Sequence, residues 1–415
     1  MKYLYRLLCL ALITCILGAC GGGGKTACSV AVGGLACSGG NSNGGGGASI
    51  PTFTYNLFHS MDNSAGEGVN PQAPLVELNG IFYGTTLAGG TANLGTVFKM
   101  DASTGQVTTI HSFVGGNTDG AIPSSGLVIG SDGNLYGTTT NGGPAEYGTV
   151  FKVAFTNSIP TVEIAYFFAG TNSDGANPVG GLIQGSDNAF YGTTSNGGSN
   201  DLGTVYKITL LGGLVAENPI YHFTGVPVGE HPQSGLIKDS AGMMYGTTSG
   251  GFSGVGTLYS IRTNGTIGFS KQFLTSDGAT PYGPLLLGSD GKLYGTTSAG
   301  GQNGLGVTFS ISTAGDSYNY TSFAGTTSDG STPNGNLIEI NNKIYGTTLS
   351  GGTYAAGTIF SVTHAGTETM VYAFGKLTDG ANPTAGMVLA ADGYYYGTTS
   401  TGGTNGLGTV YKFYP

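Results

Sequence analysis

The sequence predicts an all-β fold, a seven-bladed β-propeller, and three observations carry this prediction. Tyr-Gly-Thr-Thr followed by a glycine pair occurs seven times, at spacings of 49 to 55 residues. A period near this length, built from short strands and glycine turns, is typical of propeller blades. No segment after the first nineteen residues shows sustained helical periodicity. The chain also begins and ends out of phase with the repeat. The seven tyrosines are Tyr83, Tyr136, Tyr191, Tyr245, Tyr294, Tyr345 and Tyr396.

Each repeat contains four expected strands, which the second repeat illustrates. Residues 126–129 form an apolar first strand, and the Asp-Gly pair at 132–133 suits the tight turn that follows. Residues 135–139 are aromatic and β-branched, as expected of a second strand, and residues 148–153 form the third. We expect the fourth strand to end on a recurrent phenylalanine: Phe58, Phe113, Phe168, Phe223, Phe273, Phe323 and Phe374.

The glycine inside Tyr-Gly-Thr-Thr weakens a strand, so it marks a close approach of a neighbouring side chain or backbone.

The two ends of the repeat region predict how the ring closes. Residues 53–58 match a fourth strand with no blade before it, and residues 408–413 match a third strand with no fourth after it. We therefore expect residues 53–58 to complete the last blade as its outer strand. This pairing protects an open sheet edge and ties the two ends together.

Residues 1–19 are expected to be an export signal, because Lys2 and Arg6 precede an apolar run too short to span a bilayer. Leu17-Gly18-Ala19-Cys20 resembles the lipobox of bacterial lipoproteins. The resemblance implies cleavage before Cys20, a diacylglycerol on its thiol and acylation of its new amine. Gly21, in place of an aspartate, implies the outer membrane. The alternative is a plain secretory signal with an incidental cysteine.

Residues 20–50 are rich in Gly, Ser and Asn and predict a flexible tether. Cys28 and Cys37 lie within it, and either form a small disulfide loop or stay free thiols. The remaining residues, 51–415, are long enough for one large closed β domain.

The charge balance excludes one class of partner. Without Lys2 and Arg6, 13 − 2 = 11 basic groups face 22 acidic ones, a net charge of −11. An acidic surface repels phosphate backbones, so we expect no nucleic-acid partner. Low charge and abundant Thr, Ser, Asn and Tyr suit an extracellular monomer that binds a glycan or protein and meets the membrane through its lipid anchor alone.

The repeats resemble the GloVer tandem-repeat family of bacterial exported proteins. The seven Tyr-Gly-Thr-Thr blocks, the glycine pairs and the Gly-Thr-Val-Phe/Tyr-Lys blocks carry the resemblance over nearly all of residues 53–413. It implies a protein held at the cell surface and supplies no activity to carry over. Two departures stand out: Val and Thr are exchanged at Val307-Thr308, and the loop near Gly251 is shortened.

An acidic residue precedes each first strand, mostly in an Asp-Gly-x-x-Pro sequence. We expect these seven carboxylates to share a face with the glycine-pair loops and to ring one mouth of the central channel. Oxygen ligands suit Ca²⁺ or a cationic ligand, which is one interpretation; turn formation by Asp-Gly and Pro is the other. The residues are Glu67, Asp119, Asp174, Glu230, Asp277, Asp329 and Asp379.

Other polar residues carry weaker hypotheses. The turn aspartates, which we expect on the opposite face, are Asp132, Asp187, Asp239, Asp290 and Asp392. The histidines do not cluster in sequence, and no nucleophile, phosphate-loop or metal-helix motif is present. The leading hypothesis is therefore a binding or scaffold module for glycan or protein. The alternative is an envelope enzyme that cleaves polysaccharide with acidic loop residues, since the fold sets their spacing. Calcium-dependent stabilisation is a third.

Overall fold

The structure, a computed structural model, describes residues 54–415 except 64–65, 212–213, 252–253 and 377, together with residues 30–31 and 34–35. The chain divides into two compact units, Met1–Pro51 and Thr52–Pro415. In the first unit, β1 (Val30–Ala31) and β2 (Gly34–Leu35) pair antiparallel. The predicted signal and the three cysteines Cys20, Cys28 and Cys37 lie outside the described residues.

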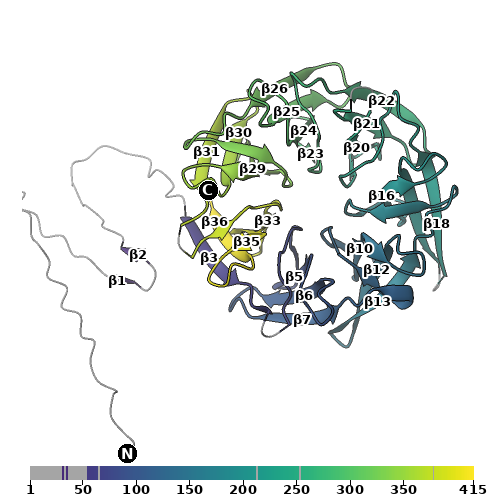
Figure 1. Cartoon of the computed structure of the whole chain (residues 1–415), viewed down its shortest axis with the longest axis horizontal. Coiled ribbons are helices and arrows are strands. Elements are labelled where there is room, and N and C mark those ends of the chain that lie inside the picture. Colours follow the sequence, from purple (N-terminus) through teal and green to yellow (C-terminus); the bar gives the residue numbers. More distant parts are fainter. Residues whose placement is uncertain are drawn as a thin grey trace, which may run out of the picture. The chain divides into compact units, whose positions relative to one another are not determined.

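The second unit is the predicted seven-bladed propeller (Figure 1). Seven antiparallel sheets surround a central opening, and each follows the order first, second, third and fourth strand from the axis to the rim. Its described residues contain no α-helix, and one three-residue 3-10 turn lies at Gly116–Thr118.

The four strands of a blade occupy constant places in the repeat. The first strands are β4 (Val76–Leu78), β9 (Val128–Ile129), β15 (Ile183–Gln184), β19 (Ile237–Lys238), β23 (Leu286–Leu287), β28 (Ile338–Ile340) and β33 (Val388–Leu389). The second strands are β5 (Ile81–Thr86), β10 (Leu135–Thr139), β16 (Phe190–Gly197), β20 (Met244–Thr248), β24 (Lys292–Thr297), β29 (Lys343–Gly351) and β34 (Tyr395–Thr399).

The outer half of each blade is longer. The third strands are β6 (Thr96–Asp101), β12 (Thr149–Thr156), β17 (Thr204–Leu211), β21 (Thr257–Ile261), β25 (Val307–Ser312), β30 (Thr358–Thr363) and β36 (Thr409–Tyr414). The fourth strands are β7 (Val107–Ser112), β13 (Ile159–Phe167), β18 (Leu214–His222), β22 (Ile267–Gln272), β26 (Tyr318–Ser322), β31 (Glu368–Ala373) and β3 (Thr54–Ser60).

Ring closure follows the prediction. The first long strand of the sequence, β3, pairs antiparallel with the last, β36, from Thr54↔Tyr414 to Ser60↔Thr409, and so forms the outer strand of the seventh blade. Tyr55 of β3 also stacks on Tyr372 of the sixth blade, with ring centroids 4.1 Å apart.

One expected member of the recurrent phenylalanine set is wrong. In the first blade, the Phe113 N–H donates to the Gly95 carbonyl at 3.0 Å. Met61, fully buried, makes the corresponding 3.0 Å bond to Gly408 in the seventh blade. Phe58 lies instead at a β-bulge, where the pairing register shifts between Leu57 and His59. The first blade has the same bulge, where Ile110 lies between the paired residues Thr109 and His111, so Phe58 corresponds to Ile110 and Met61 to Phe113.

Each residue of the Tyr-Gly-Thr-Thr motif makes a different contact in the blade, which explains why the whole motif recurs. The tyrosine hydroxyl reaches a turn aspartate, as Tyr136 does to Asp132 at 2.8 Å. The glycine lies under an aromatic ring, since a Cβ on Gly137 would be 2.6 Å from Phe151 Cζ. This confirms the predicted close approach of a neighbouring side chain.

The two threonines connect strands and blades. Thr85 donates to the Ser125 carbonyl of the next blade at 3.0 Å, and Thr398 donates to Ala73 at 3.4 Å across the closure between the seventh blade and the first. The second threonine bonds a threonine on the third strand, as Thr86 does to Thr96 at 2.8 Å.

The hydrophobic core is divided among the blade interfaces. Tyr83 and Val97 of the first blade, for example, pack with Leu127, Leu135 and Phe151 of the second. Each blade therefore buries both faces, which explains why its strands are apolar or mixed on both sides.

Candidate functional site

The loops of the propeller separate onto two faces. The linker that joins one blade to the next pairs with the loop after the second strand, as Gly120 does with Gly142. These loops form what we call the glycine-loop face, and their pairing confirms that the acidic linkers share it. The hairpin turns between first and second strands, and between third and fourth strands, form the opposite turn face.

Five of the seven linker acids lie against the rim instead of around the channel mouth, and for these five the expected position is wrong. Each of them bonds the fourth strand of the preceding blade, which forms the rim. The pairs are Glu67 with His59 at 3.0 Å, Asp119 with His111 at 3.1 Å, Asp174 with Tyr166 at 3.1 Å, Asp277 with Lys271 at 3.2 Å and Asp379 with Tyr372 at 2.7 Å. The linker carries its acid before it turns inward, which places the carboxylate far from the axis.

Backbone donors occupy the same carboxylates. Asp174 accepts from the Ala169 N–H at 2.6 Å and the Gly175 N–H at 2.7 Å. Burial alone would raise the pKa of Asp119, but hydrogen bonds from His111 and the Val114 N–H outweigh it and lower the pKa. No group of three or more His, Cys, Asp or Glu that could hold a metal occurs among the described residues. Ligand or Ca²⁺ binding by these acids stays a prediction.

Two linker acids face a second, buried carboxyl group that the sequence reasoning missed. Glu217 on β18 faces Asp174, and Glu368 on β31 faces Asp329. Burial, followed by the charge and hydrogen bond of Asp174, raises the pKa of Glu217 to about 9, and burial beside Asp329 raises that of Glu368 to about 7. One oxygen of each glutamate is buried without a hydrogen-bond partner.

The two glutamates occupy equivalent positions, opposite Ile208 and Val362 of the third strands. The first two blades carry valine at this position, Val107 and Val162, so the repeat gave no signal for a carboxyl group there.

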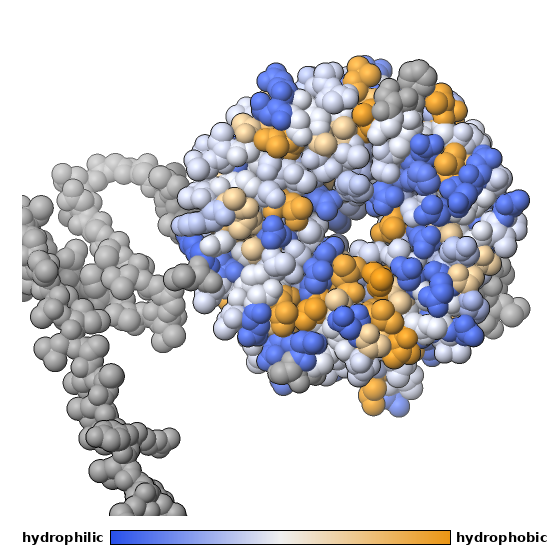
Figure 2. All heavy atoms as spheres, in the orientation of Figure 1, coloured by the Kyte–Doolittle hydropathy of each residue, from blue (hydrophilic) through white to orange (hydrophobic). Residues whose placement is uncertain are grey.

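On the glycine-loop face, the linkers of neighbouring blades come together through a different set of residues. After the proline of each linker, the backbones of neighbouring blades touch: a Cβ on Gly180 would lie 2.5 Å from the Gly235 nitrogen. Figure 2 shows the opening at the centre of the domain, with hydrophilic and hydrophobic residues around it on the face in view. The residues directly after the proline, which we call the mouth ring, are Gln72, Ser124, Val179, Gln233, Tyr282, Asn334 and Thr384.

The mouth ring is uncharged and mostly able to form hydrogen bonds. Its side chains are half-buried or exposed, and Tyr282 is 41% exposed. The Thr384 hydroxyl is buried without a hydrogen-bond partner among the described residues. Amides, hydroxyls and a phenol at the end of a channel are suited to a neutral polar ligand.

The residue before the same proline has a left-handed backbone in all seven linkers. Its φ lies between 52° and 62° at Asn70, Ile122, Asn177, His231, Thr280, Thr332 and Asn382. His231 Nδ1 lies 2.7 Å from the Ser195 carbonyl of the preceding blade, so this histidine joins two blades and does not pair with Glu230. The Glu230 backbone pairs with Gly250, in the shortened loop.

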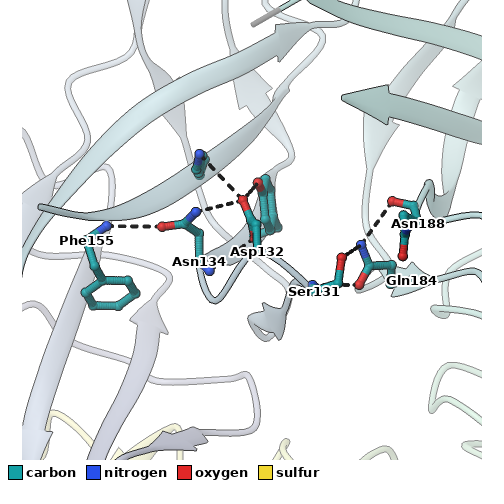
Figure 3. Close-up of polar contacts among 8 residues, drawn as sticks. Ser131, Asp132, Asn134, Phe155, Gln184 and Asn188 are labelled. Atoms are coloured by element: carbon teal, nitrogen blue, oxygen red, sulfur yellow. Dashed lines mark hydrogen bonds and ion pairs between the residues drawn. The ribbon is translucent and has the colours of Figure 1, made fainter. Parts of the chain in front are cut away.

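The turn aspartates lie on the turn face, where each accepts a hydrogen bond from the tyrosine of its own blade. The tyrosines are Tyr136, Tyr191, Tyr245, Tyr294 and Tyr396, at 2.8 to 2.9 Å. Figure 3 shows the turn of the second blade, in which the Asn134 amide also donates to Asp132 at 2.7 Å. Gln184 reaches this turn from the third blade and accepts from the Ser131 N–H at 2.8 Å. These contacts support the interpretation of the aspartates as turn formers.

No helix of the described chain is long and apolar enough to cross a membrane.

The fold is a seven-bladed propeller, and the residues that follow its linker prolines are uncharged. The chain belongs to the Gloeobacter/Verrucomicrobia repeat family, which matches it over residues 31–173, 128–327 and 240–415. The expected family is confirmed. Among curated proteins, none matches the chain.

Solved structures of similar fold share little sequence with it. Virginiamycin B lyase from Staphylococcus aureus is 12% identical with a TM-score of 0.56, over 88% of this chain and 99% of that one. The extracellular domain of a hybrid two-component system from B. thetaiotaomicron is 13% identical with a TM-score of 0.57, over 88% of this chain and 41% of that one. Oligogalacturonate lyase from Vibrio parahaemolyticus is 8% identical with a TM-score of 0.51, over 87% and 96%. These likenesses concern the fold alone.

Proposed function

We propose that this protein is a cell-envelope lipoprotein, anchored at the outer membrane through Cys20, that acts as a binding or scaffold module for glycan or protein ligands. The contact surface is the channel mouth on the glycine-loop face. A neutral glycan is the ligand that this surface suits best.

One observation carries the proposal: the mouth ring is uncharged and rich in hydrogen-bonding groups, while five of the linker acids are bonded at the rim. Gln233, Tyr282 and Asn334 offer amide and hydroxyl groups, and Tyr282 is exposed. Sugar hydroxyls both donate and accept, as amides do, so a glycan satisfies such a surface without charge pairing.

Retention on immobilised polysaccharides tests this proposal. The purified protein should be retained by one or more neutral polysaccharides of a panel, without release of new reducing ends. Tyr282→Ala and Gln233→Ala should weaken retention, each by roughly threefold to tenfold, as expected for the loss of one hydrogen-bonding contact. Tyr354→Ala, which removes a tyrosine that is 50% exposed in the glycine-pair loop of the sixth blade, is the control. Retention unchanged in both mouth variants would contradict the proposed surface.

A second function, cleavage of envelope polysaccharide, is favoured by the Asp174–Glu217 pair. A pair of neighbouring carboxyl groups is the arrangement that glycoside cleavage uses for its acid and base. Glu217 would supply the proton, because burial raises its pKa to about 9 and keeps it protonated near neutral pH.

The same polysaccharide panel separates the two functions. New reducing ends that disappear in both Glu217→Gln and Asp174→Asn would establish the enzyme and overturn the pure binding module. Retention without product, unchanged by Glu217→Gln, would remove the enzymatic alternative.

A further inference from the structure

The interface between the fifth and sixth blades departs from the repeat. In six blades the pairing of third and fourth strands contains a register shift, as at Val150/Phe151, whereas β25 and β26 pair without one. The exchange of Val and Thr noted in the sequence lies in the same strand, at Val307 and Thr308. Two independent departures therefore coincide in one blade.

A cavity of about 440 Å³ lies at this interface. It opens toward the turn face, because the turn of the β30–β31 hairpin, with His364, forms part of its wall. It is therefore on the opposite face from the mouth ring, and between neighbouring blades that Figure 1 shows side by side.

Shortened side chains open this space. Ser310 stands opposite Tyr294, as Ser260 and Ser361 stand opposite the tyrosines of the fourth and sixth blades. The four remaining blades have a lysine in this register: Lys99, Lys152, Lys207 and Lys412. Three of these lysines approach the turn aspartate of their blade, for example Lys207 to Asp187 at 2.8 Å. Thr321 stands opposite Thr308, where the other blades carry His, Tyr or Lys.

Two hydroxyl groups in the cavity are without partners. Thr308 and Ser310 both line it and are only 6% and 8% exposed. Within the described part of the chain, no protein hydrogen bond engages either hydroxyl. The equivalent Ser260 of the fourth blade accepts from the Phe269 N–H at 2.9 Å. The other six blades carry Val, Leu or Ile opposite the first threonine, so a hydroxyl at this position is specific to this blade.

The remaining walls are aromatic and carry little charge. Phe309, Phe360 and Tyr294 are buried, and Tyr320 is 41% exposed at the strand that borders the cavity. His364 stacks on Tyr294, with centroids 5.6 Å apart, and its Nε2 lies 3.1 Å from Glu339 Oε1, outside hydrogen-bond geometry. A charged ligand would lack an opposite charge here, since Glu339 already faces His364.

We propose that this cavity binds one neutral sugar residue, with its ring against the tyrosines and its hydroxyls bonded to Thr308 and Ser310. A purely apolar ligand would cover both hydroxyls without bonding them, which costs free energy. A hydroxyl-bearing ring satisfies them and covers the aromatic walls, and cavities of this size are typical of small-molecule sites. The inference is independent of the proposed function, because it uses other residues on the opposite face.

Titration of the purified protein with single sugars tests the cavity. The probes are glucose, galactose, mannose, rhamnose and N-acetylglucosamine, followed by calorimetry and by tyrosine fluorescence, which is unobscured because the chain has no tryptophan. At least one sugar should bind. Thr308→Val should weaken binding roughly threefold to tenfold, the loss expected for one hydrogen bond. Ser310→Lys restores the side chain of four other blades, fills the space and should abolish binding.

Controls make the outcome decisive. Thr308→Val restores a residue type found at the equivalent position of other blades, so an unchanged or higher melting temperature shows that the variant folds. Tyr282→Ala at the mouth ring should leave sugar binding unchanged, which separates this site from the glycan surface proposed above. The inference is overturned if none of the five sugars binds, if Ser310→Lys binds as the unmodified protein does, or if Tyr282→Ala removes the binding.

Discussion

At the scale of single residues, the tyrosine of the Tyr-Gly-Thr-Thr repeat connects the second strand to the turn that precedes it. Its ring is buried between blades, and its hydroxyl fixes the turn aspartate in five of the seven blades. Tyr83 and Tyr345 lack this bond, because their turns contain Asn79-Gly80 and Asn341-Asn342 in place of an aspartate. Tyr83 and Tyr345 can therefore serve as controls for substitution of the other five tyrosines.

Removal of one of these tyrosine hydroxyls should lower the free energy of unfolding measurably. Tyr136→Phe deletes the 2.8 Å bond to Asp132 and should destabilise the fold by about 1 kcal/mol, the usual net value of a hydrogen bond to a partly buried group. Tyr83→Phe should change stability by less than about 0.5 kcal/mol. Thermal unfolding of both variants checks this, and equal shifts in melting temperature would contradict the assigned role of the hydroxyl.

The buried carboxyl pairs predict a pH dependence. Burial, together with the neighbouring Asp174, raises the pKa of Glu217 from its ordinary value of 4.5 in the unfolded chain to about 9 in the folded protein. Between these values the folded state holds one more proton, so this residue's contribution to stability decreases as the pH rises and is fully present only below 4.5.

Glu217→Gln should therefore flatten the fall in melting temperature between pH 4.5 and about 9, and should raise the melting temperature by several degrees at the alkaline end. Glu163→Gln, which alters an exposed glutamate on the fourth strand of the second blade, is the matched control. An unchanged pH profile in Glu217→Gln would show that Glu217 ionises in the folded protein as it does in water.

At the scale of the element, each blade depends on the close fit of its second and third strands. Gly137 has an ordinary backbone, yet a Cβ there would meet Phe151 Cζ at 2.6 Å and Leu127 Cδ2 at 2.8 Å. Gly133, in the turn of the same blade, has a φ of 78° and open space around the Cβ position. One glycine is required by packing and the other by backbone conformation.

The two alanine variants should differ accordingly. Gly137→Ala should destabilise by about 1–3 kcal/mol through overpacking, and Phe151→Leu in the same chain should reduce that cost by making room. Gly133→Ala should cost about 1 kcal/mol through its left-handed backbone, with no rescue by Phe151→Leu. Chemical denaturation of the single and double variants measures both; an equal response to Phe151→Leu would refute the packing explanation.

The elements that the sequence predicted are those whose signals are local. Asp-Gly turns, alternating aromatic and β-branched segments and the phase of the chain ends located the strands, because each depends on a few neighbouring residues. The prediction for Phe58 is wrong because a phenylalanine happens to occupy the bulge position of the seventh blade, while Met61 holds the place of the recurrent phenylalanine. The linker acids were placed at the channel because the sequence does not show how far along the linker the chain turns inward.

The candidate chemistry was less predictable for the same reason. Glu217 and Asp174 are distant in sequence and meet only when neighbouring blades pack. The cavity gave one sequence signal, the exchange at Val307-Thr308, but its depth also depends on Ser310 and on the missing bulge, which are tertiary features.

At the scale of the whole molecule, the ring is held closed by β3. Its pairing with β36, the Thr398–Ala73 hydrogen bond and the Tyr55–Tyr372 stack all join the start of the chain to its end. No other blade interface is formed by segments so far apart in sequence. The stability of the ring therefore depends strongly on a seven-residue strand.

Deletion of residues 54–60 should lower the melting temperature sharply, because it uncovers the edge of β36 and the ring of Tyr411. A deletion of the same length at residues 40–46 is the control and should leave the melt unchanged. Calorimetry of both variants provides the measurement. A melt unaltered by loss of β3 would show that the seventh blade is stable with three strands.

The closure also constrains the order of events during synthesis. Within the propeller, β3 is synthesised before the other blade strands, and its partner β36 is synthesised after them. β3 therefore has no pairing partner until β36 has been synthesised. A chain truncated before residue 409 lacks β36, and β3 then has no strand to pair with.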